Sequence, residues 1–263
     1  MEELYHLYCA DCIKKLKDFP ENTFDMIFAD PPYMLSNGGI TCQNGKAVSV
    51  NKGDWDESQG LKKDFKFHKK WLSACKRVLK PNGTLWISGT YHSIYSCGFA
   101  MQLLGYHILN DISWFKPNAS PNLSCRYFTA SHETLIWARK DKKSKHYFNY
   151  DLMKDGDFSK DIIKKPHAQM RSVWAIGTPT PKEKTFGKHP TQKPLDLLER
   201  IILASTKEND LILDPFMGSG TTGVAAMKLK RQFIGIEKNP DFVVLADKRM
   251  YDAYKNRENT NEK

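Results

Sequence analysis

The chain has 263 residues, with 40 lysines and arginines against 30 aspartates and glutamates and a formal net charge of +10. It holds no apolar stretch of about 20 residues and no basic, apolar N-terminal signal, so we expect neither a membrane span nor a secretory leader. Its length suits one large domain or a domain with an insertion. The six cysteines lack a disulfide-like spacing, so we expect a cytoplasmic protein. Cys9 and Cys12 form a CxxC without a second ligand pair, and we predict no metal site.

Short apolar segments alternate with segments of helical period along most of the chain. This pattern predicts an α/β fold with a doubly wound, mostly parallel sheet covered by helices. Seven strands are predicted, at residues 5–9, 25–29, 84–88, 109–114, 134–138, 211–214 and 233–237. Helices are predicted at residues 11–17, 65–79, 93–104, 194–206, 221–229 and 240–254. Pro194 can begin its helix, and the turn Pro81-Asn82-Gly83 is expected to end another.

Two segments do not fit the alternation. Residues 34–60 are rich in glycine and asparagine and are predicted to form a long loop, which either closes over a substrate or is disordered. Residues 141–188 are polar, basic and weakly periodic, and are predicted to be an insertion outside the sheet. The chain would then consist of a first half at 1–140, the insertion, and a second half of the same domain at 189–263.

The tetrapeptide Asp30-Pro31-Pro32-Tyr33 directly follows a buried strand. A carboxylate, rigid main-chain carbonyls and an aromatic ring are the groups that could hold a planar amino group and stack on the ring that carries it. The alternative is an ordinary strand-to-turn junction, because Asp and Pro both favour turns. The motif indicates chemistry on an exocyclic amine.

A glycine turn follows the strand that ends at Asp214. Gly218, Gly220 and Gly223 match GxGxxG between a strand and a helix, and Glu237 lies 19 residues after Gly218 at the end of the next strand. Such glycines allow a tight turn and a close ligand, and a helix N-terminus favours an anion. The acidic residue can bind a ribose diol. The pattern is typical of a site for an adenosine-bearing cofactor. Alone, it does not distinguish a dinucleotide from another cofactor that carries adenosine.

The position of this turn helps to choose the cofactor. Only 26 residues follow Glu237, too few for the rest of a dinucleotide domain that starts here. The other strands must come from the N-terminal side, so the sheet is predicted to be circularly permuted. S-adenosylmethionine (SAM) fits better than NAD, because its ribose can reach Glu237, its carboxylate the turn, and its methyl group Asp30.

Positive charge is concentrated in the middle of the chain. Residues 139–193 hold 14 lysines and arginines against six acidic residues, interleaved with aromatic residues. This mixture suits phosphates and unstacked bases, while a merely solvated face is the alternative. The predicted DNA contacts in this segment are Lys164, Lys165 and Arg171.

The motifs together resemble the β-class SAM-dependent DNA amino-methyltransferases. The resemblance covers nearly the whole chain and is carried by the tetrapeptide, by His189-Pro190-Thr191-Gln192-Lys193-Pro194 and by Asp214-Pro215-Phe216 with its glycine turn. Further segments at 35–39, 122–129 and 198–203 resemble the second adenine methyltransferase of GATC-recognising type II restriction systems. That enzyme type is associated with single-stranded DNA.

The resemblance implies roles for individual residues. Asp30 and the Pro31 carbonyl would accept the hydrogens of adenine N6, Tyr33 would stack on a base that has left the helix, and transfer would be direct. The predicted catalytic residues are Asp30, Pro31, Pro32 and Tyr33. The predicted cofactor residues are Asp11, Asp30, Thr191, Lys193, Asp214, Phe216, Gly218, Ser219, Gly220, Thr221 and Glu237.

Three of these assignments have plain alternatives. Asp11 could simply cap a helix, and Thr191 and Lys193 could lie in a solvated loop. The segment Arg126-Tyr127-Phe128 resembles a lining of the target-base pocket, but its two aromatic residues could equally pack in the core.

The sequence therefore predicts a DNA adenine N6-methyltransferase that uses SAM and acts in GATC, in single-stranded or duplex DNA. A homodimer is a possible assembly, and a cognate restriction endonuclease is expected as a partner in the system without implied contact. Cytosine N4 transfer more often goes with Ser at the position of Asp30, and cytosine C5 transfer needs a Pro-Cys that is absent. A DNA cytosine N4-methyltransferase, an RNA methyltransferase and a nucleic-acid-binding protein without turnover remain as alternatives.

Overall fold

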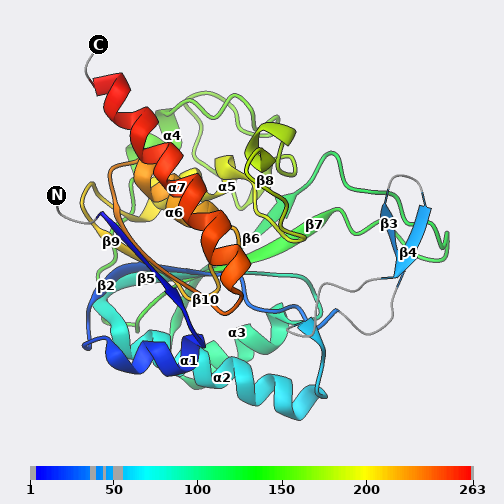
Figure 1. The fold of residues 1–263 in the computed structure, drawn as a ribbon, viewed down its shortest axis with the longest axis horizontal. Helices are drawn as coiled ribbons and strands as arrows, with labels where there is room; N and C mark the ends of the chain where they lie inside the picture. The colour runs from blue at the N-terminus through cyan, green and yellow to red at the C-terminus, as the bar shows by residue number, and fades with distance from the viewer. Residues whose placement is uncertain (1–3, 36–39, 44–45, 50–55, 262–263) are drawn as a thin grey trace.

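The computed structural model describes residues 4–35, 40–43, 46–49 and 56–261. Its centre is an eight-stranded sheet with the order β1-β10-β9-β2-β5-β7-β6-β8 (Figure 1). The strands are β1 (Tyr5–Cys9), β2 (Phe24–Ala29), β5 (Leu79–Gly89), β6 (His107–Phe115), β7 (His132–Arg139), β8 (Val173–Ala175), β9 (Leu211–Asp214) and β10 (Gln232–Glu237). Neighbours are parallel except where β7 pairs with β5 and β6. The mostly parallel α/β sheet is confirmed, and all seven predicted strands are present.

Helices cover both faces of this sheet. Helices α1 (Cys12–Lys15), α2 (Leu61–Val78) and α3 (Ile94–Leu103) lie on one face, and α5 (Leu195–Ser205), α6 (Thr221–Lys228) and α7 (Pro240–Asn261) on the other (Figure 1). A short helix that the sequence did not predict, α4 (Tyr150–Asp155), contacts α5. No helix in the described part of the chain is long and apolar enough to cross a membrane.

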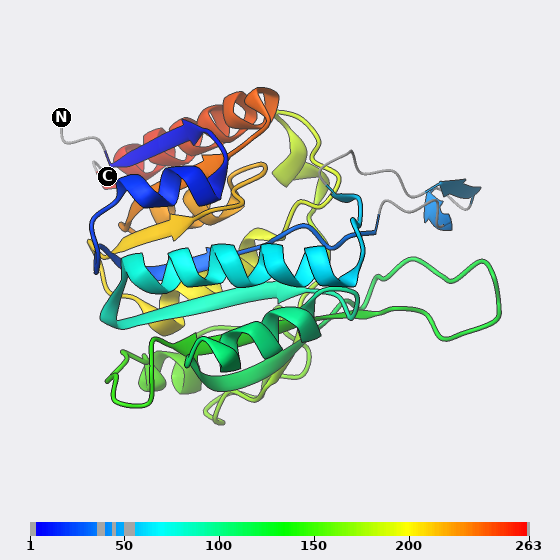
Figure 2. The same cartoon turned by 90° about the horizontal axis from the view of Figure 1, so that it is seen from below.

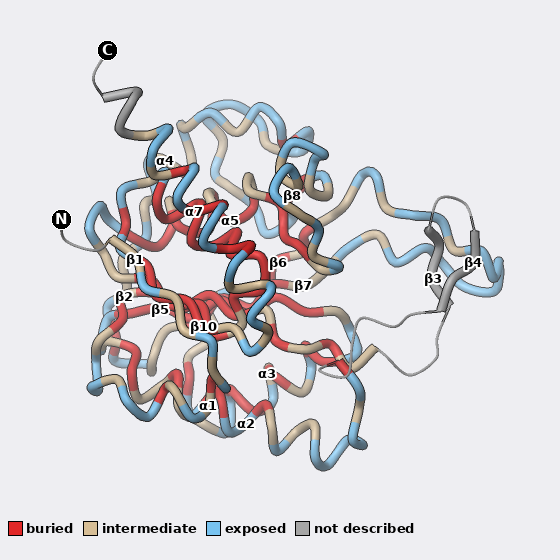
Figure 3. The backbone as a smooth tube through the Cα atoms, viewed as in Figure 1, coloured by how far each residue is buried: buried red, intermediate tan, exposed pale blue. Residues whose placement is uncertain are grey.

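The central strand β2 shows why the apolar runs of this sequence form buried strands. Met26 and Phe28 pack into the core beneath α5, α6 and α7, while Ile27 and Ala29 pack into the core beneath α1, α2 and α3. A strand between two helix layers needs apolar side chains on both faces, so its sequence is a continuous apolar run. Figure 3 shows the buried residues concentrated along the sheet.

The Pro81-Asn82-Gly83 turn has a different role from the predicted one. Helix α2 ends at Val78 and β5 begins at Leu79, so the turn does not end the helix but lies inside the strand. The register of β5 with β2 shifts there. A Cβ on Gly83 would lie 2.8 Å from the Asp25 carbonyl oxygen, which requires glycine in this bulge.

The prediction that residues 141–188 lie outside the sheet is wrong at one point. Val173–Ala175 forms β8, which pairs with β6 at the edge of the sheet. A strand of three residues is too short to show a period in the sequence. Trp174 is buried there against Trp86, with ring centroids 6.1 Å apart, so it is a core residue and not available to a base.

The predicted loop at 34–60 contains a two-stranded antiparallel hairpin, β3 (Ile40–Gln43) and β4 (Lys46–Ser49). Residues 36–39, 44–45 and 50–55 lie outside the described residues, so the role of this loop over a substrate stays a prediction. The hairpin and the connection between β6 and β7 both project from the same edge of the molecule (Figure 2).

Candidate active site

Asp30 directly follows β2, at the carboxyl edge of the sheet. Its Oδ1 accepts a hydrogen bond of 2.6 Å from the Tyr33 hydroxyl, and its Oδ2 one of 2.5 Å from Lys193 Nζ. Burial raises the pKa of Asp30 above its ordinary value, while the Lys193 ammonium acts against this rise. The tetrapeptide is therefore a buried, charged junction and not an exposed turn.

Tyr33 is only 5% exposed. Its hydroxyl also donates to Glu133 Oε2 over 2.9 Å and lies 3.1 Å from Ser88 Oγ. Burial and the two carboxylates raise the pKa of Tyr33 well above its ordinary value, so the hydroxyl remains a donor. Sequence reasoning missed Glu133 and Ser88, because neither belongs to a local motif.

Asp56 fixes the backbone after the tetrapeptide. This buried carboxylate accepts hydrogen bonds from the backbone N–H groups of Tyr33, Met34 and Leu35, at 2.7, 2.9 and 3.1 Å. Met34 takes a positive φ of 59°, which a non-glycine residue rarely adopts without such support. Sequence reasoning also missed Asp56, which lies more than 20 residues further along the chain.

Lys193 lies in the buried interior and not in a solvated loop. Besides Asp30, its ammonium lies 3.6 Å from Glu133 Oε2 and 5.2 Å from the centroid of the Tyr33 ring. Burial alone would lower the pKa of Lys193, but Asp30 and Glu133 raise it above its ordinary value. The ammonium is therefore charged and shared between two carboxylates.

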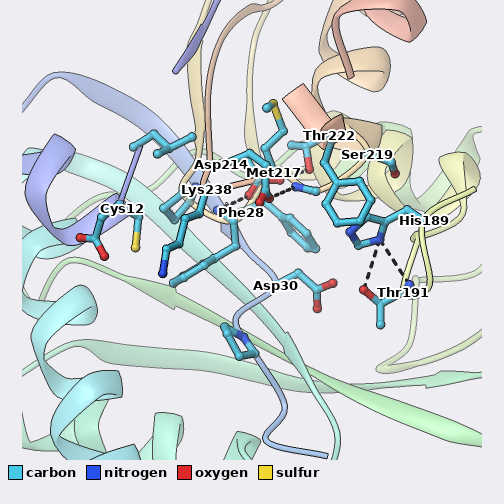
Figure 4. Close-up of a pocket in the computed structure, with 18 of the residues that line it drawn as sticks. Cys12, Phe28, Asp30, His189, Thr191, Asp214, Met217, Ser219, Thr222 and Lys238 are labelled. Atoms are coloured by element: carbon cyan, nitrogen blue, oxygen red, sulfur yellow. Dashed lines mark hydrogen bonds between the residues drawn. The ribbon is translucent and has the colours of Figure 1, made fainter. Parts of the chain in front are cut away.

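A cavity of about 370 Å³ opens beside Asp30, at the carboxyl ends of β1, β2, β9 and β10 (Figure 4). Ten of the eleven predicted cofactor residues line it, and Gly220 does not. The ten are Asp11, Asp30, Thr191, Lys193, Asp214, Phe216, Gly218, Ser219, Thr221 and Glu237. Of the prolines in the tetrapeptide, Pro32 lines the cavity and Pro31 is buried.

The glycine turn lies at the wall of this cavity. Gly218 and Gly220 have positive φ angles of 51° and 75°, and a Cβ on Gly220 would lie 2.7 Å from the Ala246 Cβ. Gly223 serves packing instead, because its Cβ would lie 2.1 Å from Met250 Sδ on α7. The three glycines thus divide between a tight turn and close helix contact.

Acidic side chains hold this wall in place. Glu237, at the end of β10, accepts hydrogen bonds from the backbone N–H groups of Gly218 and Asn239, at 2.9 and 2.8 Å. Asp214 accepts a hydrogen bond of 3.0 Å from the Phe216 N–H and one of 2.6 Å from the Thr222 hydroxyl. Burial raises the pKa of Asp214 to about 7. Asp214 therefore shapes the turn as well as lining the cavity.

Arg249 lies on α7 and belongs to no recognisable sequence motif. Its side chain supports the glycine turn. Its Nη1 donates to the Ser219 carbonyl at 2.5 Å and to the Thr221 hydroxyl at 3.1 Å. Asp11 combines both of its predicted alternatives, since it caps α1 through the Lys14 N–H at 2.9 Å and lines the cavity.

A family model described as DNA methylase matches residues 24–248. The chain belongs to this family. It is 55% identical over 242 residues to the type II methyltransferase M2.DpnII of Streptococcus pneumoniae, covering 92% of this chain and 87% of that protein. It is 49% identical over 248 residues to M2.MboI of Moraxella bovis, covering 94% and 88%.

Solved structures agree with this family. The M1.HpyAVI–SAM complex is 31% identical with a TM-score of 0.69, covering 94% of this chain and 98% of that one. The cytosine-N4-specific PvuII DNA methyltransferase, 20% identical with a TM-score of 0.70 over 97% and 93%, shares the fold. The methylase is a SAM-dependent, site-specific DNA methyltransferase, and its relatives favour adenine over cytosine N4. The predicted resemblance is confirmed.

The residues around the first cavity of this methylase fit SAM. Carboxylates of Asp30, Asp214 and Glu237 surround a space that would receive a positively charged sulfur and ammonium group. Gln192 Oε1 is buried at the same wall and has no hydrogen-bond partner among the described residues, so an acceptor is left for a ligand.

A second cavity of about 220 Å³ lies on the other side of Lys193. Tyr33, Trp114, Lys116 and Glu133 contribute to its lining. Four residues line both cavities and so separate them, namely His189, Thr191, Gln192 and Lys193. The methylase thus has two adjoining spaces, with the tetrapeptide between them.

Arg126, Tyr127 and Phe128 line neither cavity. They lie on the projecting connection between β6 and β7, where Phe128 is 98% exposed, so the alternative of core packing is wrong. Asn122 holds the tip, since its Nδ2 donates to the Tyr127 carbonyl at 2.6 Å and its Oδ1 accepts from Ser124. An ordered tip therefore presents two aromatic side chains to solvent.

The three predicted basic contacts differ in their environment. Lys165 and Arg171 are exposed, whereas the Lys164 ammonium donates to the carbonyls of Lys154 and Lys165, both at 2.8 Å. Lys165 and Arg171 are thus the more available cations of this segment.

Proposed function

We propose that this methylase transfers a methyl group from SAM to adenine N6 within GATC, accepts single-stranded DNA, and acts in a restriction-modification system. The observation that carries the proposal is the position of Asp30, which lines the cavity that fits the cofactor and bonds to Lys193 in the wall shared with the second cavity. The relatives named as type II methyltransferases support the restriction-system role.

The chemistry follows from the acceptors at Asp30. The lone pair of the adenine amino nitrogen is delocalised into the ring, so the nitrogen is a poor nucleophile. If the Asp30 carboxylate and the Pro31 carbonyl accept its two hydrogens, the nitrogen is drawn toward a tetrahedral geometry. When bound, SAM supplies the methyl group, carried on a positively charged sulfur that leaves as the N–C bond forms. Asp30 can also receive the amino hydrogen that is released as a proton.

The remaining residues are proposed to bind and orient. Glu237 would accept hydrogen bonds from the ribose diol, while Thr191 and the turn at Gly218 would hold the methionine end of the cofactor. Lys193 would border this space with its ammonium held by Asp30 and Glu133. Asp11 and Phe216 would contact the adenine of the cofactor. Ser219, Gly220, Thr221 and Asp214 would shape the wall behind it. Pro32 would support the turn, and Tyr33 would offer an edge or face of its ring to the target base through the second cavity.

Transfer assays with labelled SAM test the proposal. The substrates are single-stranded and duplex oligonucleotides with and without GATC, together with a matched RNA. We expect label on adenine N6 in GATC-containing DNA, including the single strand. Label on cytosine N4, or label in RNA and none in DNA, would contradict the proposed substrate.

The DNA contacts proposed at the basic segment predict a change in salt dependence. Replacing both Lys165 and Arg171 by alanine should weaken binding to a single strand and reduce the slope of log K against log salt by about 0.7 for each phosphate that is no longer neutralised. Lys164→Ala should have a smaller effect, because its ammonium is bound to backbone carbonyls. Fluorescence anisotropy across salt concentrations measures the slope, with the exposed Lys248→Ala on α7 as control. An unchanged slope would mean that the segment is only a solvated face.

The exposed connection at Arg126, Tyr127 and Phe128 is proposed to contact DNA near the target base. Exposed aromatic rings beside a cation can stack on unpaired bases, and this contact tolerates any sequence. The geometry favours a base next to the target, because these residues line neither cavity.

A homodimer is proposed through α3. Tyr95, Phe99 and Leu103 lie four residues apart on this helix and are 74%, 55% and 54% exposed. The helix carries no charged residue, which disfavours nucleic acid and suits an apolar protein surface, here a second copy of the chain. Light scattering should give about twice the 30.3 kDa chain mass, and a Tyr95→Glu, Phe99→Glu double variant should give a monomer. A monomeric wild type would contradict the dimer. The cognate endonuclease remains a partner in the system without proposed contact.

A further inference from the structure

Two carboxylates, Asp30 at the first cavity and Glu133 at the second, share the same two hydrogen-bond donors. The Tyr33 hydroxyl lies 2.6 Å from Asp30 Oδ1 and 2.9 Å from Glu133 Oε2. Lys193 Nζ lies 2.5 Å from Asp30 Oδ2 and 3.6 Å from the same Glu133 Oε2. Asp30 follows β2 and Glu133 is the second residue of β7, so the fold brings together residues that are 103 positions apart.

Glu133 is held as a permanent anion. Its Oε1 accepts a hydrogen bond of 3.0 Å from the Lys116 ammonium, and its Oε2 lies 3.3 Å from Ser88 Oγ. Burial alone would raise the pKa of Glu133, but Lys193 and Lys116 lower it to about 2. Two carboxylates thus face two ammonium groups, and this buried group of charges is balanced.

The balance creates a requirement for the proposed reaction. An amino group that donates to Asp30 competes with the Lys193 ammonium for the same oxygens. A buried cation that loses its partner is strongly unfavourable unless another anion replaces it. Glu133 is the other carboxylate already in contact with this ammonium.

We propose that Glu133 is a positioning residue, which takes over the Lys193 ammonium and the Tyr33 hydroxyl when the amino group of the target base occupies Asp30. This inference rests on the proposed function. It assigns Lys116 the role of keeping Glu133 ionised and in place, through contact with the carboxylate and not with the base.

Glu133→Gln tests the inference, because it keeps the shape and removes the charge. Without a second anion for Lys193, we expect kcat on a GATC single strand to fall about 10²-fold, with unchanged SAM affinity. The titratable groups that face Asp30 are Lys193, Glu133, Tyr33 and Asp214, and the negative charge of Glu133 raises the pKa of Asp30. Removing it lowers that pKa, so the acid limb of the kcat profile should move to lower pH. A purely structural role would not move this limb.

Lys116→Met provides the opposite change. It removes a positive charge beside Glu133 and leaves Lys193 as the sole ammonium for both carboxylates. The pKa of Asp30 should then rise, and the acid limb should move to higher pH. This variant also tests the inference if Glu133→Gln does not fold.

Asp25→Asn is the matched control for both variants. Asp25 pairs with Lys80 at 2.7 Å in β2, the strand that leads to Asp30, but at its opposite end. The Asp25→Asn variant should leave kcat and the acid limb of its pH profile unchanged. The inference is overturned if Glu133→Gln has the wild-type kcat. It is also overturned if Glu133→Gln and Lys116→Met both have a lower kcat but the acid limb of the pH profile does not move in either. An inactive wild type on adenine would instead overturn the proposed function.

Discussion

Replacement of Asp30 by alanine should remove methyl transfer, with kcat at least about 10²–10³-fold lower, while single-stranded DNA still binds. The carboxylate is the acceptor expected to localise the lone pair of the amino nitrogen, and it lies closer to the Tyr33 hydroxyl than Glu133 does, at 2.6 against 2.9 Å. The proposed DNA contacts are left in place by this change. The loss should therefore fall on kcat and not on the affinity for DNA.

The pH dependence of the wild-type enzyme is a second test of the role of the Asp30 carboxylate. Burial raises the pKa of Asp30 above its ordinary 3.8, against the effect of Lys193. The acceptor is ionised above this raised pKa, so transfer should be lost as the pH falls through it. Single-turnover rates, with SAM and DNA dissociation constants measured separately, distinguish binding from transfer. Transfer at the wild-type rate in Asp30→Ala would eliminate the proposed mechanism, and Asp25→Asn again serves as the control.

The parts of the fold that sequence could predict are those with local physical signatures. Strands β1 and β9 have the bounds that the sequence predicts, because each is a short, largely apolar or aromatic segment that ends at a turn. The glycine turn was predictable for a similar reason. Positive φ angles at Gly218 and Gly220 need glycine, so the requirement is written in the sequence itself.

The parts that sequence could not predict depend on tertiary pairing. Glu133 lies in β7 and Lys116 directly follows β6, and nothing in the sequence around either charged residue marks it. Asp56 reaches back to the backbone at Tyr33 from beyond a hairpin. These contacts exist only after the sheet order has brought β2, β5 and β7 together. Local patterns therefore located the tetrapeptide but not the charges that hold it.

The packing of the basic segment onto the sheet also escaped prediction, and it has a large expected effect on stability. Asp161 and Arg200 form a buried ion pair, with Nη1 and Oδ2 2.6 Å apart. Asp161 Oδ1 also accepts a hydrogen bond of 3.1 Å from the backbone N–H of Ala175 in β8. The guanidinium lies 5.0 Å from the centroid of the Trp174 ring. One carboxylate thus joins the inserted segment, the edge strand and α5.

Asp161→Ala should lower the free energy of unfolding by about 3–5 kcal/mol, because it leaves a buried guanidinium without its anion. Adding Arg200→Met should recover part of that loss, since no unpaired charge then remains in the interior. Urea denaturation followed by circular dichroism measures both values. The exposed Lys160–Asp196 pair is the matched control, and Lys160→Met should cost at most about 1 kcal/mol. If Asp161→Ala costs no more than that control, the ion pair does not fix the segment to the sheet, and β8 is held by its pairing with β6 and by the packing of Trp174.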